Sequence, residues 1–281
     1  MAKVTVAIPA SVVSDTPHLR EKTSKIGLIG RAAAIFRVKE IVVYTDNPKA
    51  NQRADLDLIA TLLEYMETPQ YLRKRLFKIE PRLKYAGILP PLRTPHHPLN
   101  RKAERLKVGE YREGVVISET KEGLLVDIGV EHAALLREKQ FAVGKRVTVQ
   151  IVKAGGQVEA QAVSGEVPDY WGYAVTAERH LLKRLLETRK FDLAIGTSVK
   201  GVNWASVAGE VAEKWSKAGS VLVAFGAPAR GLYEVAKDEG WQLEETVDFV
   251  VNTIPRQGTE TVRTEEAVFA SLSILNVQCE F

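Results

Sequence analysis

Short runs of β-branched and other apolar residues alternate along the chain with segments in which apolar residues recur every three or four positions. The first pattern is typical of buried strands and the second of amphipathic helices. Because strands that alternate with helices are typical of a parallel sheet, the pattern predicts an α/β fold. The expected strands are residues 4–8, 41–45, 191–196, 221–225 and 247–252, and the expected helices are residues 19–38, 53–66, 178–186, 206–215 and 265–275.

The last expected helix has a recognisable start signal. Thr264 can cap its N-terminus, since a threonine hydroxyl accepts a hydrogen bond from a backbone amide of the first turn. Glu265 and Glu266 then fall within that turn, where the helix dipole favours negative charge.

The pattern changes in the middle of the chain. Short alternating runs follow one another there with tight turns between them, which predicts a small antiparallel β-barrel of the OB type, a common oligonucleotide-binding fold. A structural insert or an interaction module is the alternative. The expected barrel strands are residues 109–118, 123–129, 145–153 and 157–164, and proline-rich joints lie at 89–98 and 167–168. The expected domains are an N-terminal part of the α/β domain at 1–88, the inserted barrel with a basic linker at 89–166, and a C-terminal part of the α/β domain at 167–281.

The composition is that of an ordinary globular protein. The chain has 281 residues, of which 45% are hydrophobic and 26% charged, so it can bury a sizeable core and is not disordered. Its apolar runs, such as residues 221–225, are far shorter than the roughly 20 residues that span a membrane. Residues 1–10 do not resemble a secretory signal, and Cys279 is the single cysteine, which excludes an internal disulfide. We expect a soluble, cytoplasmic protein.

Charge is distributed unevenly along the chain. Residues 71–107 contain eleven Lys or Arg against two Glu, whereas residues 221–281 contain four basic and ten acidic residues. Clustered basic side chains neutralise phosphates and release counterions, so the first stretch predicts nucleic-acid binding. A solvated linker face is the alternative. The expected RNA contacts are Arg73, Lys74, Arg75, Lys78, Arg82, Lys84, Arg101 and Lys102.

Common catalytic templates are absent from the sequence. No Gly-x-Gly-x-x-Gly motif follows the first strand, and no Gly-x-Ser-x-Gly motif occurs. Residues 226–231 space two glycines as a phosphate-binding loop does, but Leu232 and Tyr233 stand where Lys and Ser or Thr are required. His96 and His97 are adjacent in a proline-bracketed loop, where we expect a basic or turn-forming role and no metal site.

Two glycine-containing segments follow the last two expected strands. Residues 225–232 contain Gly226 and Gly231, and residues 252–266 contain Gly258 among several threonines. Open α/β sheets bind ligands at the carboxyl ends of their strands, so both segments predict a ligand site. The glycines would let the backbone approach a ligand closely or adopt a positive φ. A turn-forming role is the alternative for each glycine taken singly.

These segments resemble the fingerprint of the SPOUT superfamily of RNA methyltransferases, in particular the archaeal and eukaryotic family with an OB-like barrel inserted in the N-terminal half of the methyltransferase domain. The resemblance also rests on the opening VTVAIPA at residues 4–10, on residues 30–44 and on IGTSVKG at residues 195–201. It is strongest at QGTETVRTEEA, residues 257–267, and it spans almost the whole chain.

The resemblance implies a deep C-terminal trefoil knot, which physical reasoning alone would not propose because threaded chains are nearly absent among folds. It also implies a homodimer and S-adenosylmethionine bound in the knot, and the acidic C-terminal region suits a sulfonium cation. Residues 198–201 form an edge of the implied site. The implied cofactor contacts are Phe225, Gly226, Ala227, Gly231, Asn252, Thr253, Ile254, Gln257, Gly258, Thr259, Thr261, Val262 and Thr264.

Methylation of a uridine at N3 requires loss of the N3 proton. Arginine cannot accept it because its pKa exceeds about 12, so we expect Glu260 to be the proton acceptor. Arg31 and Arg263 are expected to stabilise the base or its phosphate electrostatically. If the chain is a dimer of the family type, Arg31 of one subunit approaches the cofactor of the other. A structural salt bridge is the alternative role for each of the three residues.

The sequence therefore indicates an S-adenosylmethionine-dependent RNA methyltransferase. Its expected substrate is ribosomal RNA, with a pyrimidine ring nitrogen such as uridine N3 as the acceptor. The alternative is a non-catalytic RNA-binding or ribosome assembly factor on a methyltransferase scaffold. The glycine-rich and threonine-rich segments argue against this alternative, because they indicate retained cofactor binding.

Overall fold

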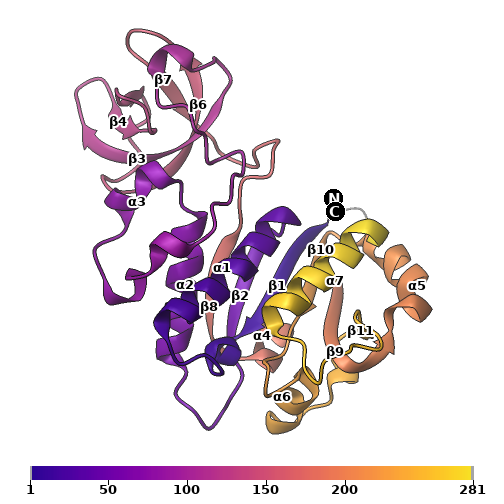
Figure 1. The fold of residues 1–281 in the computed structure, drawn as a ribbon. Helices are drawn as coiled ribbons and strands as arrows, with labels where there is room; N and C mark the ends of the chain where they lie inside the picture. Colours follow the sequence, from indigo (N-terminus) through magenta and orange to yellow (C-terminus); the bar gives the residue numbers. More distant parts are fainter. Residues whose placement is uncertain (1, 280–281) are drawn as a thin grey trace. The chain divides into compact units, whose positions relative to one another are not determined.

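The computed structural model describes residues 2–279. The chain folds into two compact units. The sheet unit comprises Met1–Met66, Pro81–Pro91 and Tyr173–Phe281, and the barrel unit comprises Glu67–Glu80 and Leu92–Gly172. The early and late parts of the chain thus combine in one unit, and Figure 1 shows the indigo helix α1 beside the yellow helix α7.

The sheet unit is built on a six-stranded sheet in the order β11-β9-β10-β1-β2-β8, and every neighbouring pair is parallel. This arrangement confirms the predicted parallel α/β sheet. All six strands place their carboxyl ends at the same edge, which we call the carboxyl edge. The strands are β1 (Lys3–Pro9), β2 (Glu40–Thr45), β8 (Ala174–Leu181), β9 (Leu193–Asn203), β10 (Ser220–Ala224) and β11 (Phe249–Asn252).

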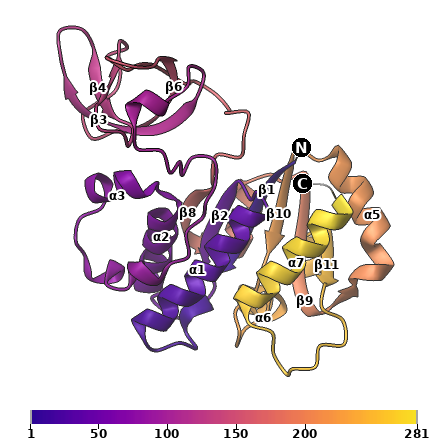
Figure 2. The same ribbon diagram turned by 45° about the horizontal axis from the view of Figure 1, so that its top comes forward.

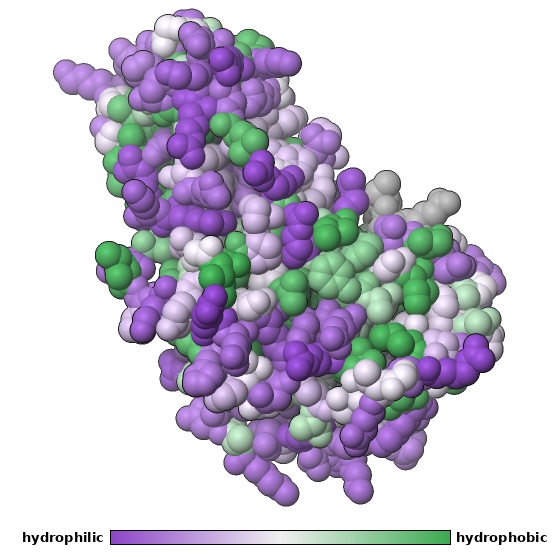
Figure 3. Space-filling model, viewed as in Figure 1, coloured by the Kyte–Doolittle hydropathy of each residue, from purple (hydrophilic) through white to green (hydrophobic). Residues whose placement is uncertain are grey.

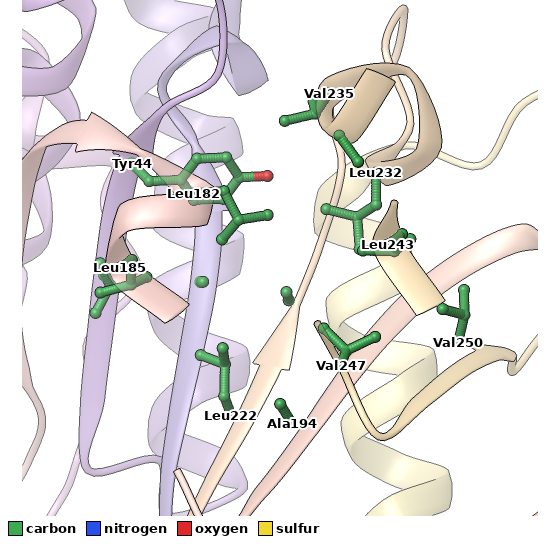
Figure 4. Close-up of a cluster of buried hydrophobic side chains, with 14 residues drawn as sticks. Tyr44, Leu182, Leu185, Ala194, Leu222, Leu232, Val235, Leu243, Val247 and Val250 are labelled. Carbon is green, nitrogen blue, oxygen red and sulfur yellow. The ribbon is translucent and has the colours of Figure 1, made fainter. Parts of the chain in front are cut away.

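Helices cover both faces of this sheet, as expected for strands whose successive side chains are all buried. Helices α1, α5 and α7 pack together on one face (Figure 2). On the other face a hydrophobic cluster joins Tyr44 of β2 and Leu182 of α4 to Leu232 of α6 (Figure 4). The helices of the sheet unit are α1 (Leu19–Ile35), α2 (Arg53–Glu67), α4 (Leu182–Thr188), α5 (Trp204–Lys217), α6 (Leu232–Asp238) and α7 (Thr264–Cys279).

The barrel unit contains a closed five-stranded barrel in the order β3-β4-β5-β7-β6. Its neighbouring strands are antiparallel except for β5 and β7, which pair in parallel. Apolar side chains such as Val116, Val126 and Val149 fill the interior. The elements are α3 (Gln70–Leu76), β3 (Tyr111–Glu119), β4 (Leu124–Asp127), β5 (Ala134–Leu136), β6 (Arg146–Lys153) and β7 (Glu159–Ala162). Short 3-10 turns occur in the chain at Ala10–Val13, Pro81–Leu83, Ala86–Ile88, Ala103–Arg105 and Leu243–Glu245.

One predicted element was wrong. The helix expected at residues 178–186 is divided, because β8 continues to Leu181 and α4 begins only at Leu182. Pairing with β2 overrides the local helical pattern here. Four further elements were not expected: the amino-terminal half of β8, the three-residue β5, and the seven-residue helices α3 and α6.

Within residues 2–279, no helix is both long enough and apolar enough to cross a membrane.

Candidate functional site

A cavity of about 330 Å³ opens at the carboxyl edge of the sheet, where β9, β10 and β11 end. Its walls come from the two segments that the sequence singled out, from the end of β9 and from the first half of α7. Because each wall follows a different strand, the parallel sheet brings together residues that are up to about 70 positions apart in the chain.

The loop after β10 is held in shape from several sides. The Tyr44 hydroxyl donates a hydrogen bond to the Phe225 carbonyl at 2.7 Å, and the Thr264 hydroxyl donates to the Gly226 carbonyl at 3.0 Å. The Ala227 amide donates to the Arg230 carbonyl at 2.9 Å, which closes a tight turn. The loop is therefore a preformed wall of the cavity.

Glycine is required at position 226 for a reason that differs from the expected one. A Cβ there would lie 2.8 Å from the Gly231 Cα and 2.9 Å from the Leu232 nitrogen, so the loop packs against its own backbone. A Cβ at Gly258 would meet nothing within 4 Å. Gly226, Gly231 and Gly258 are not among the positive-φ residues, which excludes the second of the two expected reasons and leaves close approach to a ligand as a prediction. Arg256, with φ 57°, adopts a positive φ in the second loop.

The loop after β11 is fixed by its own side chains. The Asn252 amide nitrogen donates to the Val199 carbonyl, and its oxygen accepts from the Ile254 nitrogen, both at 3.0 Å. The Gln257 amide nitrogen lies 3.0 Å from both the Thr259 and the Glu260 carbonyls and donates to them. These bonds order the segment that carries the remaining polar wall of the cavity.

Helix α7 contributes through its first turns. Thr264 is its first residue, not the expected cap, because its hydroxyl is used as a donor to Gly226. The Arg263 nitrogen instead donates to the Glu266 carboxylate at 2.9 Å. Two turns further on, the Ser271 hydroxyl lies 2.8 Å from that of Thr253, both buried, and this contact ties the helix to the loop after β11.

Strand β9 makes an excursion beside the cavity. Val250 of β11 pairs with Gly196, yet the next residue, Val251, pairs with Val202, so residues 197–201 leave the pairing, and residues 197–200 line the cavity. Within this excursion Lys200 donates to Glu234 of α6 at 2.5 Å. That hydrogen bond lowers the pKa of the Glu234 carboxyl from its ordinary value. Glu234 therefore presents an ionised carboxylate to the cavity.

The predicted cofactor residues divide into two sets. Gly258 and Thr259 belong to the loop but are not among the residues that line the cavity, whereas the other eleven line it. Sequence reasoning missed Thr197 of β9 and, on the helices, Glu234, Ala267 and Ser271. Glu234 lies three residues after Gly231, in the first turn of α6, and Ala267 and Ser271 share one face of α7, so helical periodicity could have indicated them.

The three predicted catalytic residues are placed differently. Glu260 lines the cavity and is exposed. Arg31, on α1, donates to the Pro91 carbonyl at 2.9 Å, and Arg263 is exposed just before α7 begins. Neither arginine is among the cavity-lining residues of the described chain. Their catalytic roles stay predictions.

The predicted RNA contacts are spread over both units. Arg82 and Lys84 lie in the sheet unit, where Arg82 donates to the Asp57 carbonyl and Lys84 lies over the Tyr85 ring. The other six lie in the barrel unit: Arg73, Lys74, Arg75, Lys78, Arg101 and Lys102. Of these, Arg75 pairs with Asp127 at 2.5 Å, and Lys102 lies 4.0 Å from Glu131. These bonds do not test the predicted RNA binding, which stays a prediction.

The barrel unit contains a cluster of buried charged and polar side chains, which we call the barrel network. Arg146 of β6 donates to the Glu67 carboxylate at 2.6 Å and to the Glu113 carboxylate at 2.5 Å. The Trp171 indole nitrogen also donates to Glu113, at 2.5 Å. His96, fully buried, has its Nε2 3.0 Å from a Glu67 carboxylate oxygen.

Ionisation in the barrel network is strongly shifted. Burial disfavours the charged form of Glu67, but hydrogen bonds from His96 and Arg146 outweigh it and lower the pKa to about 2. Burial, together with the neighbouring His96, lowers the pKa of His97 to about 4. His97 is therefore neutral near pH 7. Of the two expected roles, the basic one is wrong for His97. The turn is present, since the His97 nitrogen donates to the Thr94 carbonyl at 2.9 Å, and the His97 Nε2 joins the network 2.5 Å from the Glu67 carbonyl oxygen.

Comparison with known proteins gives the family. The family model described as Putative RNA methyltransferase matches residues 3–275. An uncharacterized protein of Halobacterium salinarum is 36% identical over 97% of this chain and 98% of its own length. Proteins of Mus musculus and Homo sapiens, both named 28S rRNA (uridine-N(3))-methyltransferase, are 33% and 32% identical. These two matches cover 97% of this chain and 75% and 77% of the relatives.

The fold defines an α/β protein with a cavity at the carboxyl edge of its sheet and an accompanying barrel. The chain belongs to the RNA methyltransferase family just described. It is thus an enzyme that uses a methyl donor and acts on RNA.

Proposed function

We propose that the chain transfers a methyl group from S-adenosylmethionine to N3 of a uridine in ribosomal RNA. The observation that carries the proposal is the cavity in which the loops after β10 and β11 meet the end of β9, which we call the cofactor cavity. The activity for which the Mus musculus and Homo sapiens relatives are named supports uridine N3 as the acceptor.

The chemistry of the cavity walls fits S-adenosylmethionine. Ile254 and Val262 offer apolar surface suited to an adenine ring, and the backbone and side chains of the loop after β11 offer polar partners. The Glu234 and Glu260 carboxylates suit a positively charged sulfonium. Bound there, the cofactor supplies an electrophilic methyl group. The residues of the chain hold it in line with the acceptor, and such positioning supplies much of the rate.

The acceptor nitrogen must lose its proton as the N3–carbon bond forms and the carbon–sulfur bond breaks. Among the three predicted catalytic residues only Glu260 lines the cavity, and its carboxylate is the proposed proton acceptor. Arg263, three residues further along the same loop, is proposed to stabilise the negative charge that develops on the base. The role of Arg31 requires a second subunit.

We also propose the family arrangement of two subunits with knotted C-terminal parts. Supporting a homodimer, apolar side chains are exposed on the sheet unit at Leu28 and Ile35 of α1, at Val199 and Val202 of β9, and at Val277 of α7. Figure 3 shows hydrophobic residues over α7 and its neighbours. Sedimentation of the active enzyme as a species of about twice 31.1 kDa is expected, and an active monomer would contradict the dimer.

The barrel is proposed to be an OB-type RNA-binding module. Its strand order and its single parallel pair, β5 with β7, support this reading, as does the basic stretch that includes Lys74, Lys78 and Arg101. The ranges 1–88 and 167–281 are proposed as the two parts of the methyltransferase domain and 89–166 as the insertion with its linker.

The proposed function is tested with purified protein, S-adenosylmethionine and unmodified large-subunit rRNA transcribed in vitro. Nucleoside mass spectrometry should detect 3-methyluridine only when enzyme and cofactor are both present. Calorimetric titration should show cofactor binding by the enzyme alone. Methylation at another atom would overturn the uridine N3 assignment, and no cofactor binding at millimolar concentration would overturn the proposed site.

A further inference from the structure

A second cavity, of about 510 Å³, lies at the carboxyl edge where β2 and β8 end. Its lining includes Arg53, Arg179, His180 and Arg184, together with the amide side chains of Asn47 and Gln52. No carboxylate is among the described residues that line it. We call it the arginine cavity, and it lies wholly within the sheet unit.

A bulge in β8 places Arg179 and His180 in this cavity. Tyr44 of β2 pairs with Glu178, but the next residue, Thr45, pairs with Leu181. Arg179 and His180 are therefore two extra residues that leave the strand pairing, and both are exposed. Bulges of this kind redirect side chains and are frequent beside active sites. The local structure thus takes Arg179 and His180 out of the strand pairing, at the edge that also holds the cofactor cavity.

The arginines of the arginine cavity have few acidic partners within the described chain. Across the described chain, neither Arg179 nor Arg184 makes an ion pair, and both side chains are exposed. Arg53 is 3.9 Å from Asp57 and its side chain is 68% exposed, so that contact is weak. By contrast, Arg189, a few residues beyond Arg184, is paired with Glu40. Three arginines without strong partners in one concave site indicate an anionic ligand.

The opposite wall of the cavity is rigid and polar. The Gln52 side chain is buried, and its oxygen accepts from the Asp46 and Asn47 nitrogens at 2.9 Å. Its nitrogen donates to the Asp46 carboxylate at 2.7 Å. Asp46, fully buried, lies 3.8 Å from Arg230 of the loop after β10. The wall of the arginine cavity is therefore connected, through buried side chains, to the loop after β10.

We propose that the arginine cavity binds phosphate groups of the substrate RNA strand that leads to the methylated nucleotide. The proposal rests on the proposed function, since it assumes that RNA is the substrate. Both cavities lie along one edge of one sheet, so a single strand that follows this edge can place its backbone on Arg179 and Arg184 while presenting a base to the cofactor cavity. Arginine forks match phosphate geometry.

The test compares two double variants that remove the same charge. Arg179→Gln with Arg184→Gln changes the cavity, and Lys190→Gln with Lys217→Gln is the control. Both control lysines are exposed and lie just before β9 and β10 begin, at the opposite edge of the sheet. The probe is a fluorescein-labelled oligouridylate of about 12 nucleotides, followed by anisotropy at several salt concentrations, with S-adenosylmethionine binding measured in parallel.

We expect the cavity variant to bind the probe about tenfold more weakly than the control and to lose about 0.7 from the salt slope for each phosphate contact removed. Cofactor affinity should not change in either variant. Equal Kd values and equal salt slopes for the two variants would overturn the proposed phosphate binding in the arginine cavity, while leaving the proposed function intact. Failure of the unaltered protein to bind both the probe and rRNA would overturn the RNA substrate itself and the cavity with it.

Two further arms identify the source of the phosphate. An oligouridylate with uncharged methylphosphonate linkages should bind the cavity variant and the control equally, since no phosphate charge remains to be recognised. Inorganic phosphate titrated into the unaltered protein should bind only weakly. Sub-millimolar binding of inorganic phosphate that is lost in the cavity variant, combined with unchanged RNA affinity, would assign the cavity to a free anion and overturn the proposal.

Discussion

The barrel network and the cofactor cavity both contain basic and acidic side chains, but these side chains are largely buried in the network and more exposed in the cavity. In the barrel network Arg146, Glu67, Glu113 and Trp171 are bonded to one another and largely buried. In the cofactor cavity the single ion pair among the described lining residues joins Lys200 to Glu234, and Glu260 stands exposed beside it.

The difference concerns where the groups with strongly shifted pKa values lie in this molecule. Perturbed pKa values often mark functional sites, yet here the large shifts of Glu67 and His97 lie in the barrel network, where every carboxylate has a fixed partner. The cofactor cavity instead combines open space with loops that other residues hold in place. In this fold the dense charge cluster is structural, and the preformed loops surround the cavity that we propose as the active site.

The largest expected effect that separates the two regions is that of pH on stability. Between pH 6.5 and about 4 the unfolded chain binds a proton at His97 that the folded barrel does not, and between pH 4.5 and about 2 the same holds for Glu67. Both contributions are present at neutral pH and lost on acidification, on the order of several kcal/mol in total. In the sheet unit the pKa of Glu40 is lowered while those of Glu239 and Glu265 are raised. Their contributions to the pH dependence of stability therefore have opposite signs.

Hydrogen exchange measured by mass spectrometry from pH 7 to pH 4 resolves the two units. The amides of β3 and β6 should lose protection before those of β1 and β10. In the His97→Phe variant the part of this difference between pH 6.5 and 4 should shrink. Equal loss of protection in both sheets would contradict the assigned role of the network.

Arg146→Met breaks the barrel network directly and should lower the free energy of unfolding by about 3 to 5 kcal/mol, because it leaves two buried carboxylates without their cation. Denaturant unfolding followed by circular dichroism measures the loss. Arg137→Met, at an exposed pair with Glu159, is the matched control and should cost under about 1 kcal/mol. S-adenosylmethionine affinity of the folded variant should be unchanged, and a selective loss of cofactor binding would place the network in the active site.

Glu260→Gln tests the cofactor cavity, where we expect an effect on activity and none on stability. Removal of the proposed proton acceptor should slow methyl transfer about 100-fold without changing stability. The residual rate should rise with pH, since hydroxide can remove the N3 proton of the substrate where the carboxylate is absent. Single-turnover methylation across pH 6 to 9 measures both effects. A flat profile with an unchanged rate would mean that another group accepts the proton.

Gly226→Ala and Gly258→Ala form a matched pair with a smaller expected difference. A Cβ at Gly226 meets the Gly231 backbone and would displace the loop, so cofactor affinity should fall about tenfold, equivalent to 1.4 kcal/mol. A Cβ at Gly258 meets open space, so affinity should stay within about twofold. Calorimetric titration of both variants checks the pair. Equal losses would show that the loop after β11 closes on the cofactor.

The sequence predicts most of the sheet because the central strands are buried on both faces and read as apolar runs. Strand β8 is the exception, since its side chains are mainly half-buried or exposed and its stability comes from backbone pairing with β2. Strand β5, with three residues, is too short to show any period. Local pattern therefore fails where an element depends on a neighbour distant in sequence.

The cavity loops could be predicted for a similar reason, since Gly226 and Asn252 directly follow apolar strands and the chain direction fixes where strands end. The barrel network could not be predicted in this way. Glu67 and His96 are 29 residues apart, and Arg146 is 79 residues from Glu67. Only the closed barrel brings these residues together, and no spacing in the sequence predicts the contact.

The pairing of β1 with β10 has a consequence for how the protein is made. Lys3 lies opposite Ser220, so the second strand of this pair leaves the ribosome more than 200 residues after the first. At about 5 to 20 residues per second, β1 remains without β10 for roughly 10 to 40 s. The barrel, whose strands all fall between residues 111 and 162, can close during that interval. Such nonlocal pairing makes folding slow, and the apolar edge of β1 is open to chaperones or to aggregation until β10 arrives.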